Sequence, residues 1–346
     1  MQSYNIAKRL RLAAAALLLA FSPAAVFEAL AAGGREADAL TLYSGRGEAL
    51  VDPLIERFAE ETGIKVNVRY GGTAELAVLL QEEGSRTPAD LFWAQDAGAL
   101  GALSTADRFR ELPEDLYADL PAISRSRTGS WVATSGRARV LVYSSERVEE
   151  DERPSSVFDL ADERYAGRFG WAPTNGSFQA FVTAMRVVHG DDRTADWLEA
   201  MDEGGALRYR NNTALVEAIG AGEIDFTITN NYYLLRFLAD DPDYPASQMF
   251  FEDGDIGNLV NVAGVAILAE SDRREQAVEF VRFLLSRWSQ EFFTGEIYEY
   301  PVLEGVEPNP QLETFETLLE ASPELDLDAM EDLDGTLALL RELGLL

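Results

Sequence analysis

Residues 40–93 read LTLYSGRGEALVDPLIERFAEETGIKVNVRYGGTAELAVLLQEEGSRTPADLFW, and this stretch decides the fold class. Apolar runs at 40–43 and 89–93 and an alternating run at 64–70 predict three strands. The segments between them, 48–62 and 74–83, carry apolar residues at helical spacing, and each is followed by a glycine. This β-α-β-α-β order predicts an α/β protein built on an open, mostly parallel sheet.

The same alternation of strand and helix patterns continues toward the C-terminus. Further strands are predicted at 139–143, 168–171 and 260–268, and further helices at 178–188, 196–202 and 276–285. The acidic tail from Glu304 predicts two more helices, at 311–319 and 337–343, that pack against the rest of the chain. Ligands of such sheets bind at the carboxyl ends of strands, so we expect a site near loops 44–48 and 94–96.

The first 32 residues have the pattern of a signal peptide. Lys8, Arg9 and Arg11 precede the apolar run LAAAALLLAF at 12–21, and Ala29-Leu30-Ala31 matches a cleavage site. This apolar run is shorter than a membrane span. The chain has no cysteine, which excludes disulfides and a lipidated cysteine after the signal. These features predict export to the periplasm or another extracytoplasmic space, with residues 1–32 removed.

Size and charge narrow the classes of function. About 310 residues follow the signal, more than a single core usually holds, and this predicts two lobes. The net charge of −31 makes nucleic acid and anionic membrane surfaces poor partners. Only Lys8 and Lys65 are lysines, so the acidic, arginine-rich composition fits either a salty environment or a GC-rich genome. The five tryptophans, Trp93, Trp131, Trp171, Trp197 and Trp288, are expected in the core.

Residues 229–233, TNNYY, place two adjacent phenols directly after two side-chain amides. A phenol has a pKa of about 10, so it binds weakly acidic cations poorly at neutral pH. A hard trivalent cation displaces the phenolic proton, so Tyr232 and Tyr233 indicate Fe³⁺ more than Zn²⁺ or Ca²⁺. Ordinary packing of an aromatic pair in a strand is the alternative. Neighbours on a strand face opposite sides, so a shared ligand requires the strand to end at the pair.

Six motifs together resemble the periplasmic ferric iron-binding proteins, the substrate-binding components of ABC importers, over nearly the whole mature chain. They are LYSGR at 42–46, EETGIKV at 60–66, QEEGSRTPADLF at 81–92, SGRARV at 135–140, NNYY at 230–233 and YEYP at 298–301. The runs at 81–92 and 230–233 are specific in combination. The resemblance implies a type II periplasmic-binding-protein fold with two lobes, a cleft and two hinge crossings, near 133–139 and 261–266.

The resemblance also implies a division of the chain into two lobes and a membrane partner. Lobe 1 would comprise residues 38–134 and 263–302, and lobe 2 would comprise 135–262 and 303–346 with the C-terminal helices. The resemblance further implies delivery of the ligand to an ABC permease of the inner membrane. We also expect a monomer that, given its negative charge, binds no nucleic acid.

The family's metal site carries over unevenly onto this sequence. Tyr232 and Tyr233 match its phenolate ligands. Gly47 and Glu48 stand where the first loop of the family often has a histidine, sometimes followed by a tyrosine. The resemblance therefore leaves Glu48 as the acidic ligand candidate on this loop.

The second loop and the helix of the second lobe differ as well. Gln95 stands where some members have a glutamate, with Asp96 beside it, and residues 174–178 lack the tyrosine that other members have there. Two phenolates do not fill the shell of six-coordinate iron. We therefore expect Glu48, Asp96, water or an exogenous anion such as carbonate to complete it.

An anion site is expected at Asn175, Gly176 and Ser177, because they precede a helix and helix N-termini bind anions. Arg137 or Arg139 would hold that anion through paired hydrogen bonds, and ordinary hinge salt bridges are an equal alternative for each arginine. The other residues expected to line the cleft are Ser44, Gly45, Arg46, Gln95 and Asn231.

Three functions remain to be compared. The first is capture of Fe³⁺ for an ABC importer, and the second keeps this transport role with a small oxyanion or a polar organic solute as ligand. An enzyme on the same fold is the least supported, because the chain lacks cysteine, a G-x-S-x-G run and a phosphate-binding G-x-x-x-x-G-K-[ST] loop. The single histidine, His189, has no second histidine to form a transition-metal set. We therefore predict a ferric iron-binding transport protein without enzymatic activity.

Overall fold

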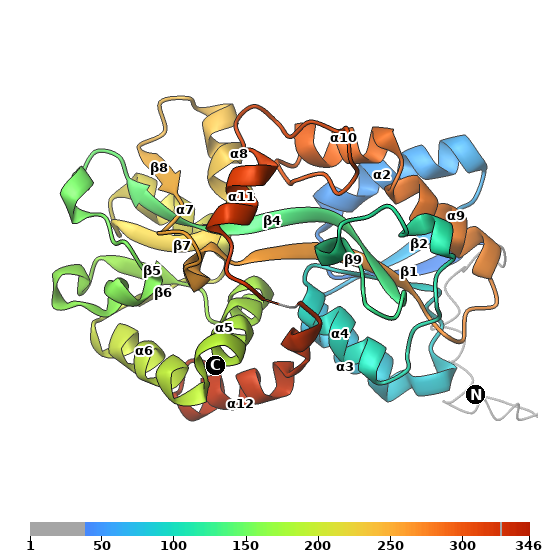
Figure 1. The fold of residues 1–346 in the computed structure, drawn as a ribbon, viewed down its shortest axis with the longest axis horizontal. Helices are drawn as coiled ribbons and strands as arrows, with labels where there is room; N and C mark the ends of the chain where they lie inside the picture. Colours follow the sequence, from blue (N-terminus) through green and yellow to red (C-terminus); the bar gives the residue numbers. More distant parts are fainter. Residues whose placement is uncertain (1–38, 326) are drawn as a thin grey trace, which may run out of the picture. The chain divides into compact units, whose positions relative to one another are not determined.

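The computed structural model describes residues 39–325 and 327–346, and the predicted signal peptide at 1–32 lies outside them. Within the described part, nine strands form one sheet in the order β2-β1-β3-β9-β4-β7-β5-β6, with β8 paired to β4 (Figure 1). The strands are β1 (Leu40–Ser44), β2 (Val66–Tyr70), β3 (Leu91–Ala94), β4 (Trp131–Ser144), β5 (Phe169–Trp171), β6 (Leu207–Arg208), β7 (Phe226–Asn230), β8 (Ala246–Met249) and β9 (Val260–Ile267). The helices are α2 (Glu48–Thr62), α3 (Thr73–Glu83), α4 (Ala97–Thr105), α5 (Gly176–His189), α6 (Asp191–Glu203), α7 (Asn212–Ala221), α8 (Tyr232–Asp240), α9 (Arg274–Leu284), α10 (Arg287–Gly295), α11 (Phe315–Ala321) and α12 (Leu333–Glu342).

The first half of the sheet, β1 to β3, confirms the predicted β-α-β-α-β order. β1 pairs in parallel with both β2 and β3. Helix α2 buries Val51, Leu54 and Phe58, and Gly63, with a φ of 75°, follows its last residue. Gly45 N–H donates to the Trp93 carbonyl over 2.8 Å. The loops that follow β1 and β3 therefore lie side by side, as expected of parallel strands.

Two long strands, β4 and β9, join this half to the second half of the sheet, β5 to β8. β4 pairs with β9 between Trp131 and Ala138 and with β7 between Arg139 and Tyr143. Polar residues and a register shift near Ser135 interrupt the apolar alternation, so the sequence predicted only its last part as a strand. The predicted hinge crossings coincide with β4 and β9, whereas the assignment of residues to two lobes stays a prediction.

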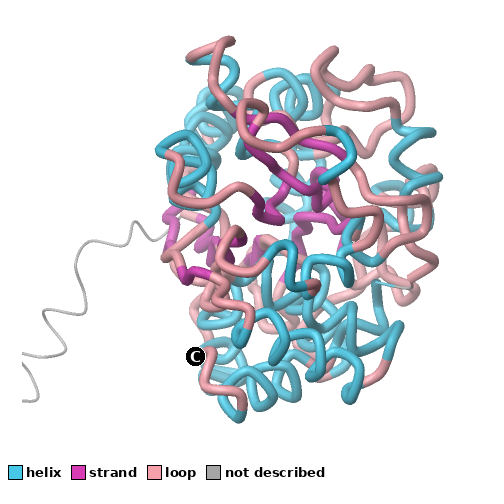
Figure 2. Tube along the Cα trace, turned by 90° about the vertical axis from the view of Figure 1, so that its left-hand side faces the viewer, coloured by secondary structure: helices cyan, strands magenta, loops and turns pink. Residues whose placement is uncertain are grey.

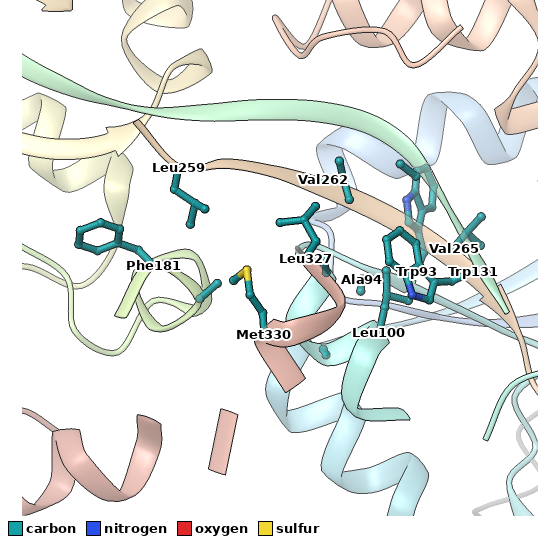
Figure 3. Close-up of a cluster of buried hydrophobic side chains, with 14 of the residues drawn as sticks. Trp93, Ala94, Leu100, Trp131, Phe181, Leu259, Val262, Val265, Leu327 and Met330 are labelled. Atoms are coloured by element: carbon teal, nitrogen blue, oxygen red, sulfur yellow. The ribbon is translucent and has the colours of Figure 1, made fainter. Parts of the chain in front are cut away.

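The strands lie among the helices and loops (Figure 2). Buried side chains of one extended hydrophobic cluster lie along β9, with Trp93 and Leu100 toward one end and Phe181 toward the other (Figure 3). Leu327 and Met330 join them from η8 (Leu327–Glu331), a 3₁₀ helix in the C-terminal tail that packs on α4 and α5. Helix α12 then packs on α5. The expectation that the tail packs against the rest of the chain is confirmed.

Two sequence-based expectations were wrong for local physical reasons. Trp288 is 39% exposed, because its ring stacks on Phe292 at 5.7 Å and lies 5.3 Å from the Arg57 guanidinium, contacts that need no core. The first tail helix begins at residue 315 rather than 311, because the Thr314 side chain caps it by accepting from Thr317 N–H over 3.1 Å. Among the described residues, no helix is long and apolar enough to cross a membrane.

Candidate functional site

Tyr232 and Tyr233 lie at a junction between a strand and a helix. β7 ends at Asn230 and α8 begins at Tyr232, so the strand does end at the pair, as a shared ligand requires. Asn231 already has a helical backbone conformation, with φ of −51° and ψ of −38°. The two ring centres are 4.5 Å apart and the rings are tilted by 36°. The two phenols are therefore neighbours on one side and do not face opposite sides of the sheet.

The hydroxyl oxygen of Tyr232 accepts two side-chain hydrogen bonds. Gln95 Nε2 donates to it over 2.9 Å and Asn230 Nδ2 donates over 3.1 Å. Gln95 follows β3 in the first half of the sheet, and Tyr232 is 1% exposed. Two N–H donors on one oxygen stabilise negative charge there, so this environment suits a phenolate.

The hydroxyl of Tyr233 is in a different environment. Burial raises the pKa of Tyr233 above its ordinary value, and the neighbouring Tyr232 raises this pKa further, while Asn212 and Arg236 lower it. The Tyr233 phenol is therefore protonated at neutral pH. A weakly acidic cation does not displace that proton, whereas a trivalent cation does.

Arg139 contacts the backbone of the second half of the sheet. Its Nη1 donates to the Ser177 carbonyl over 3.1 Å and its Nη2 to the Ile228 carbonyl over 2.8 Å. Burial lowers the pKa of Arg139 to about 9; nearby Arg137 lowers it as well, and Tyr232 and Tyr233 act in the opposite direction. The guanidinium thus lies in the electrostatic field of both phenols, within a strongly desolvated environment.

Arg137 is 1% exposed, and in the part of the chain that the structure describes no acceptor bonds to any of its three guanidinium nitrogens. Neither Arg137 nor Arg139 forms an ion pair among those residues, so the alternative of hinge salt bridges gains no support. A guanidinium carries five N–H donors, and buried donors in proteins are normally paired. The donor set of Arg137 therefore fits an anion.

Asp96 is near Arg137 but serves the start of α4. Its Oδ1 accepts from Ala99 N–H over 3.2 Å, as a helix N-cap does. Burial raises the pKa of Asp96, and Arg137 with the backbone N–H groups of Ala99 and Gly98 opposes that rise. Asp96 therefore lies near Arg137, and its carboxylate is already engaged as the N-cap of α4.

The predicted turn before α5, residues 175–177, lies next to Arg139, which donates to the Ser177 carbonyl. Asn175 Oδ1 accepts from Ser177 N–H over 3.0 Å and from Ser177 Oγ over 2.6 Å. Asn212 Nδ2 donates to the same Ser177 Oγ over 3.1 Å. Asn212, at the start of α7, contacts both this turn and Tyr233, and sequence reasoning missed it. The Asn211-Asn212 pair before an apolar helix was its only signal.

The loop after β1 has less to do with the tyrosines than predicted. Arg46 Nη2 pairs with Glu299 Oε2 at 2.8 Å, with both side chains fully buried, and its Nη1 donates to Ser135 Oγ over 3.2 Å. Ser44 Oγ bonds the backbone of Arg46. Glu48 is exposed and acts on Tyr70, whose pKa burial, Asp52 and Glu48 all raise. Arg46 and Ser44 are thus engaged in other contacts in this conformation, whereas the Glu48 carboxylate is exposed.

Gly45 contributes through its lack of a side chain. A Cβ there would lie 2.1 Å from Thr73 Oγ1, so only glycine allows this approach. Thr73 Oγ1 accepts from Gln95 N–H over 3.1 Å. The first loop thereby positions Gln95, which in turn reaches Tyr232. Among residues 39–325 and 327–346, no group of three or more His, Cys, Asp or Glu side chains converges as a metal site.

Comparison with known proteins agrees with this geometry. Residues 43–291 match the family described as bacterial extracellular solute-binding proteins. The Fe(3+)-binding periplasmic protein of Serratia marcescens is 30% identical over 95% of this chain and 96% of its own length. The chain belongs to the periplasmic ferric iron-binding proteins.

Solved structures support the same placement. Iron-bound HitA from Pseudomonas aeruginosa is 32% identical and superimposes with a TM-score of 0.84, covering 88% of this chain and 99% of that one. A Trichodesmium protein in complex with iron and citrate ligands is 26% identical with a TM-score of 0.74, covering 89% of this chain and 100% of that one. The type II periplasmic-binding-protein fold expected from the sequence is confirmed, and ferric iron-binding proteins of this kind are extracytoplasmic.

Proposed function

We propose that this protein captures ferric iron between the two halves of its sheet and delivers it to an ABC importer. The observation that carries the proposal is the tyrosine pair: two phenol rings 4.5 Å apart at the end of β7, with two amide donors on the oxygen of Tyr232. Such oxygens suit a hard trivalent cation once the protons leave. The relatives named for ferric iron support the same ligand.

In this proposal Tyr232 and Tyr233 bind iron as phenolates. Gln95 and Asn230 stabilise the Tyr232 oxygen, and the Arg236 guanidinium, 4.9 Å from the Tyr232 ring centre and 6.0 Å from that of Tyr233, adds positive charge beside both rings. Two phenolates leave a net positive charge on Fe³⁺. The rest of the shell must therefore supply negative charge.

An exogenous anion is the first candidate for that charge. Arg137 offers a buried guanidinium with no hydrogen-bond acceptor in the described part of the chain, Arg139 lies beside it, and the turn Asn175-Gly176-Ser177 opens a helix next to Arg139. Carbonate or a small carboxylate has the flat, bidentate shape that a guanidinium binds. The iron and citrate in the Trichodesmium protein show that an organic anion accompanies iron in one relative.

Glu48 and Asp96 remain the protein's own candidates for the same positions. Both lie on loops of the first half of the sheet, Glu48 exposed and Asp96 engaged as a helix cap. They would bind iron only after the two halves move, since domain closure is the usual second step of capture in this fold. Iron and anion would thus bind first on the second half of the sheet.

The alternative ligands and an enzymatic role are less well supported. Binding of an oxyanion or a polar organic solute would not explain the paired phenols. Arg137 and Arg139 alone would suit such a ligand. An enzyme would need a nucleophile or an acid–base pair, and the chain has no cysteine and one histidine, while among the described residues no three His, Cys, Asp or Glu side chains are grouped so that they could hold a metal.

The cellular setting completes the proposal. Residues 1–32 would direct export and be cleaved, and the mature chain would act in the periplasm as a monomer that docks on an inner-membrane permease. The division into lobe 1 (38–134 and 263–302) and lobe 2 (135–262 and 303–346) would give the two parts that close. A relative in Sinorhizobium fredii is named as a probable ABC transporter periplasmic-binding protein.

Titration with a labile ferric chelate, in degassed buffer with and without bicarbonate, tests the anion. Tighter binding with bicarbonate is expected, along with a visible charge-transfer band from the ferric phenolate. Equal affinity in both buffers would instead favour Glu48 or Asp96 as the remaining ligand. The Arg137→Met variant is the matched control, because it should respond to bicarbonate less than the unmodified protein does.

A further inference from the structure

Tyr298, in the loop after α10, has a backbone conformation that tyrosine rarely adopts. Its φ is 62°, and among the described residues Asp107 is the one other non-glycine with a positive φ. A bulky residue in this region is strained and stays there only when its surroundings fix it. Glycine would adopt the same conformation without strain. A tyrosine at this position is therefore less favourable for the backbone than a glycine would be.

Side chains from the start of α8 hold this loop. Asn231 Nδ2 donates to the Tyr298 carbonyl over 3.0 Å, while Asn231 Oδ1 accepts from Ala138 N–H over 3.0 Å. Arg236 Nη2 donates to the Ile297 carbonyl over 3.5 Å. Arg236 is the same residue whose guanidinium lies over the Tyr232 ring. The loop is thus tied to the helical turn that carries the tyrosine pair.

The two residues after Tyr298 are committed to other contacts. Glu299 is fully buried in its ion pair with Arg46. Tyr300 is 1% exposed and packs in a small apolar cluster with Ala138 and Leu318. Tyr298 itself is half-buried, and its hydroxyl has no hydrogen-bond partner among residues 39–325 and 327–346. Within this motif, the described residues give the Tyr298 side chain no hydrogen bond, ring contact or cation–π contact.

We propose that Tyr298 is a third phenol ligand of the iron site, supplied from the α10 side of the molecule. The inference rests on the proposed function. The iron site otherwise has too few anionic ligands. Glu48 is exposed beside Tyr70 and Asp96 caps α4, so the described residues supply two anionic ligands, the phenolates of the tyrosine pair. On binding, the Tyr298 O–H bond breaks, an O–Fe bond forms and the proton passes to solvent.

The test compares iron-loaded Tyr298→Phe with Tyr300→Phe, a control in the same motif whose ring is part of the core. Tyr298→Phe should fold normally, absorb less visible light per iron at a shifted wavelength, and bind iron roughly 10- to 100-fold more weakly, the range seen when a supporting metal contact is lost. Tyr300→Phe should leave the wavelength, the absorbance per iron and the affinity unchanged. Wild-type colour and affinity in Tyr298→Phe would overturn the inference.

Tyr298→Gly separates a ligand from a structural residue. Relief of the backbone strain should raise the melting temperature of the iron-free protein while iron binding weakens as in Tyr298→Phe. Higher stability with wild-type iron binding would contradict a ligand role. If Tyr232→Phe and Tyr233→Phe abolish the band and Tyr298→Phe does not change it, this inference alone fails. If none of the three variants changes the band, the proposed function fails as well.

Discussion

Gln95 Nε2 donates a 2.9 Å hydrogen bond to the hydroxyl oxygen of Tyr232, which is 137 positions away in the chain. Gln95 follows β3 in the first half of the sheet, and Tyr232 opens α8 in the second half. The bond therefore joins the two halves at the oxygen that we propose as an iron ligand. If Tyr232 binds iron as proposed, we expect iron capture and the approach of the two halves to be coupled through this contact.

Removing either phenol oxygen should abolish or greatly weaken iron binding. Tyr233→Phe should lose the charge-transfer band with little change in the stability of the iron-free protein. Tyr232→Phe should lose the band too, and should cost about 1–3 kcal/mol of unfolding free energy, because the amides of Gln95 and Asn230 lose their acceptor. Visible spectra and urea unfolding of both variants measure this difference. An unaltered band in either variant would show that another phenol is the ligand.

Replacing Gln95 tests which group faces iron from the first half of the sheet. Gln95→Glu puts a carboxylate beside the Tyr232 oxygen, so it should raise iron affinity and reduce its dependence on bicarbonate. Gln95→Leu removes the same N–H donor without adding a ligand, and should weaken binding. Ferric titrations of the two variants with and without bicarbonate give the comparison. Identical behaviour of Glu and Leu at this position would exclude residue 95 from the metal's surroundings.

Arg137 and Arg139 should respond in opposite ways to loss of the guanidinium. Arg137→Met removes a buried guanidinium that has no hydrogen-bond acceptor among the described residues, although the Asp96 carboxyl lies near it, so the unfolding free energy of the iron-free protein should be unchanged or higher by up to about 3 kcal/mol. Arg139→Met should destabilise it by about 1–3 kcal/mol for each backbone acceptor left unpaired, at Ser177 and Ile228. Urea unfolding at neutral pH measures both. A large loss of stability in Arg137→Met would mean that its guanidinium has a structural role.

Asp225 should make the second half of the sheet sensitive to acid. Burial opposes ionisation of its carboxyl, but hydrogen bonds of 2.7 Å from Arg147 Nε and from Arg168 Nε outweigh it, so the pKa of Asp225 lies below its ordinary value. A carboxyl group whose pKa is lower in the folded state stabilises the fold at pH values above its unfolded-state pKa. This stabilisation is lost as the pH falls through the folded-state pKa. Asp225→Asn should therefore cost about 1–3 kcal/mol at pH 7 and progressively less below pH 4 or so. A difference independent of pH would exclude this linkage.

Much of the fold could be predicted from the sequence because its signals are local. The period of the apolar residues and the glycine after each helix were enough to predict the strands and helices of residues 40–93, where α2 matches its predicted bounds. The polar middle of β4 could not be predicted, because its strand character comes from pairing with β9 and β7 rather than from alternation. Trp288 was wrongly placed in the core for the same reason, since Phe292 and Arg57 provide its contacts at the surface.

The candidate site divides in a similar way. The strand-to-helix junction at Tyr232 follows from residues next to each other in the chain, and the structure confirms it. The isolation of Arg137, the pairing of Arg46 with Glu299 and the contacts of Asn212 depend on segments far apart in sequence. No single-sequence pattern carries such contacts. The ligand roles of Glu48, Asp96 and the anion-binding residues stay predictions.

The most direct test of the central claim is a metal analysis with a visible spectrum of protein purified without chelators. We predict one ferric ion per chain and a phenolate-to-iron absorption band that disappears when a strong chelator removes the iron. In the double variant with both Tyr232 and Tyr233 changed to Phe, neither iron nor band should be present. A colourless, iron-free wild-type protein that carries a small oxyanion or organic solute, or a double variant that keeps the band, would contradict the account.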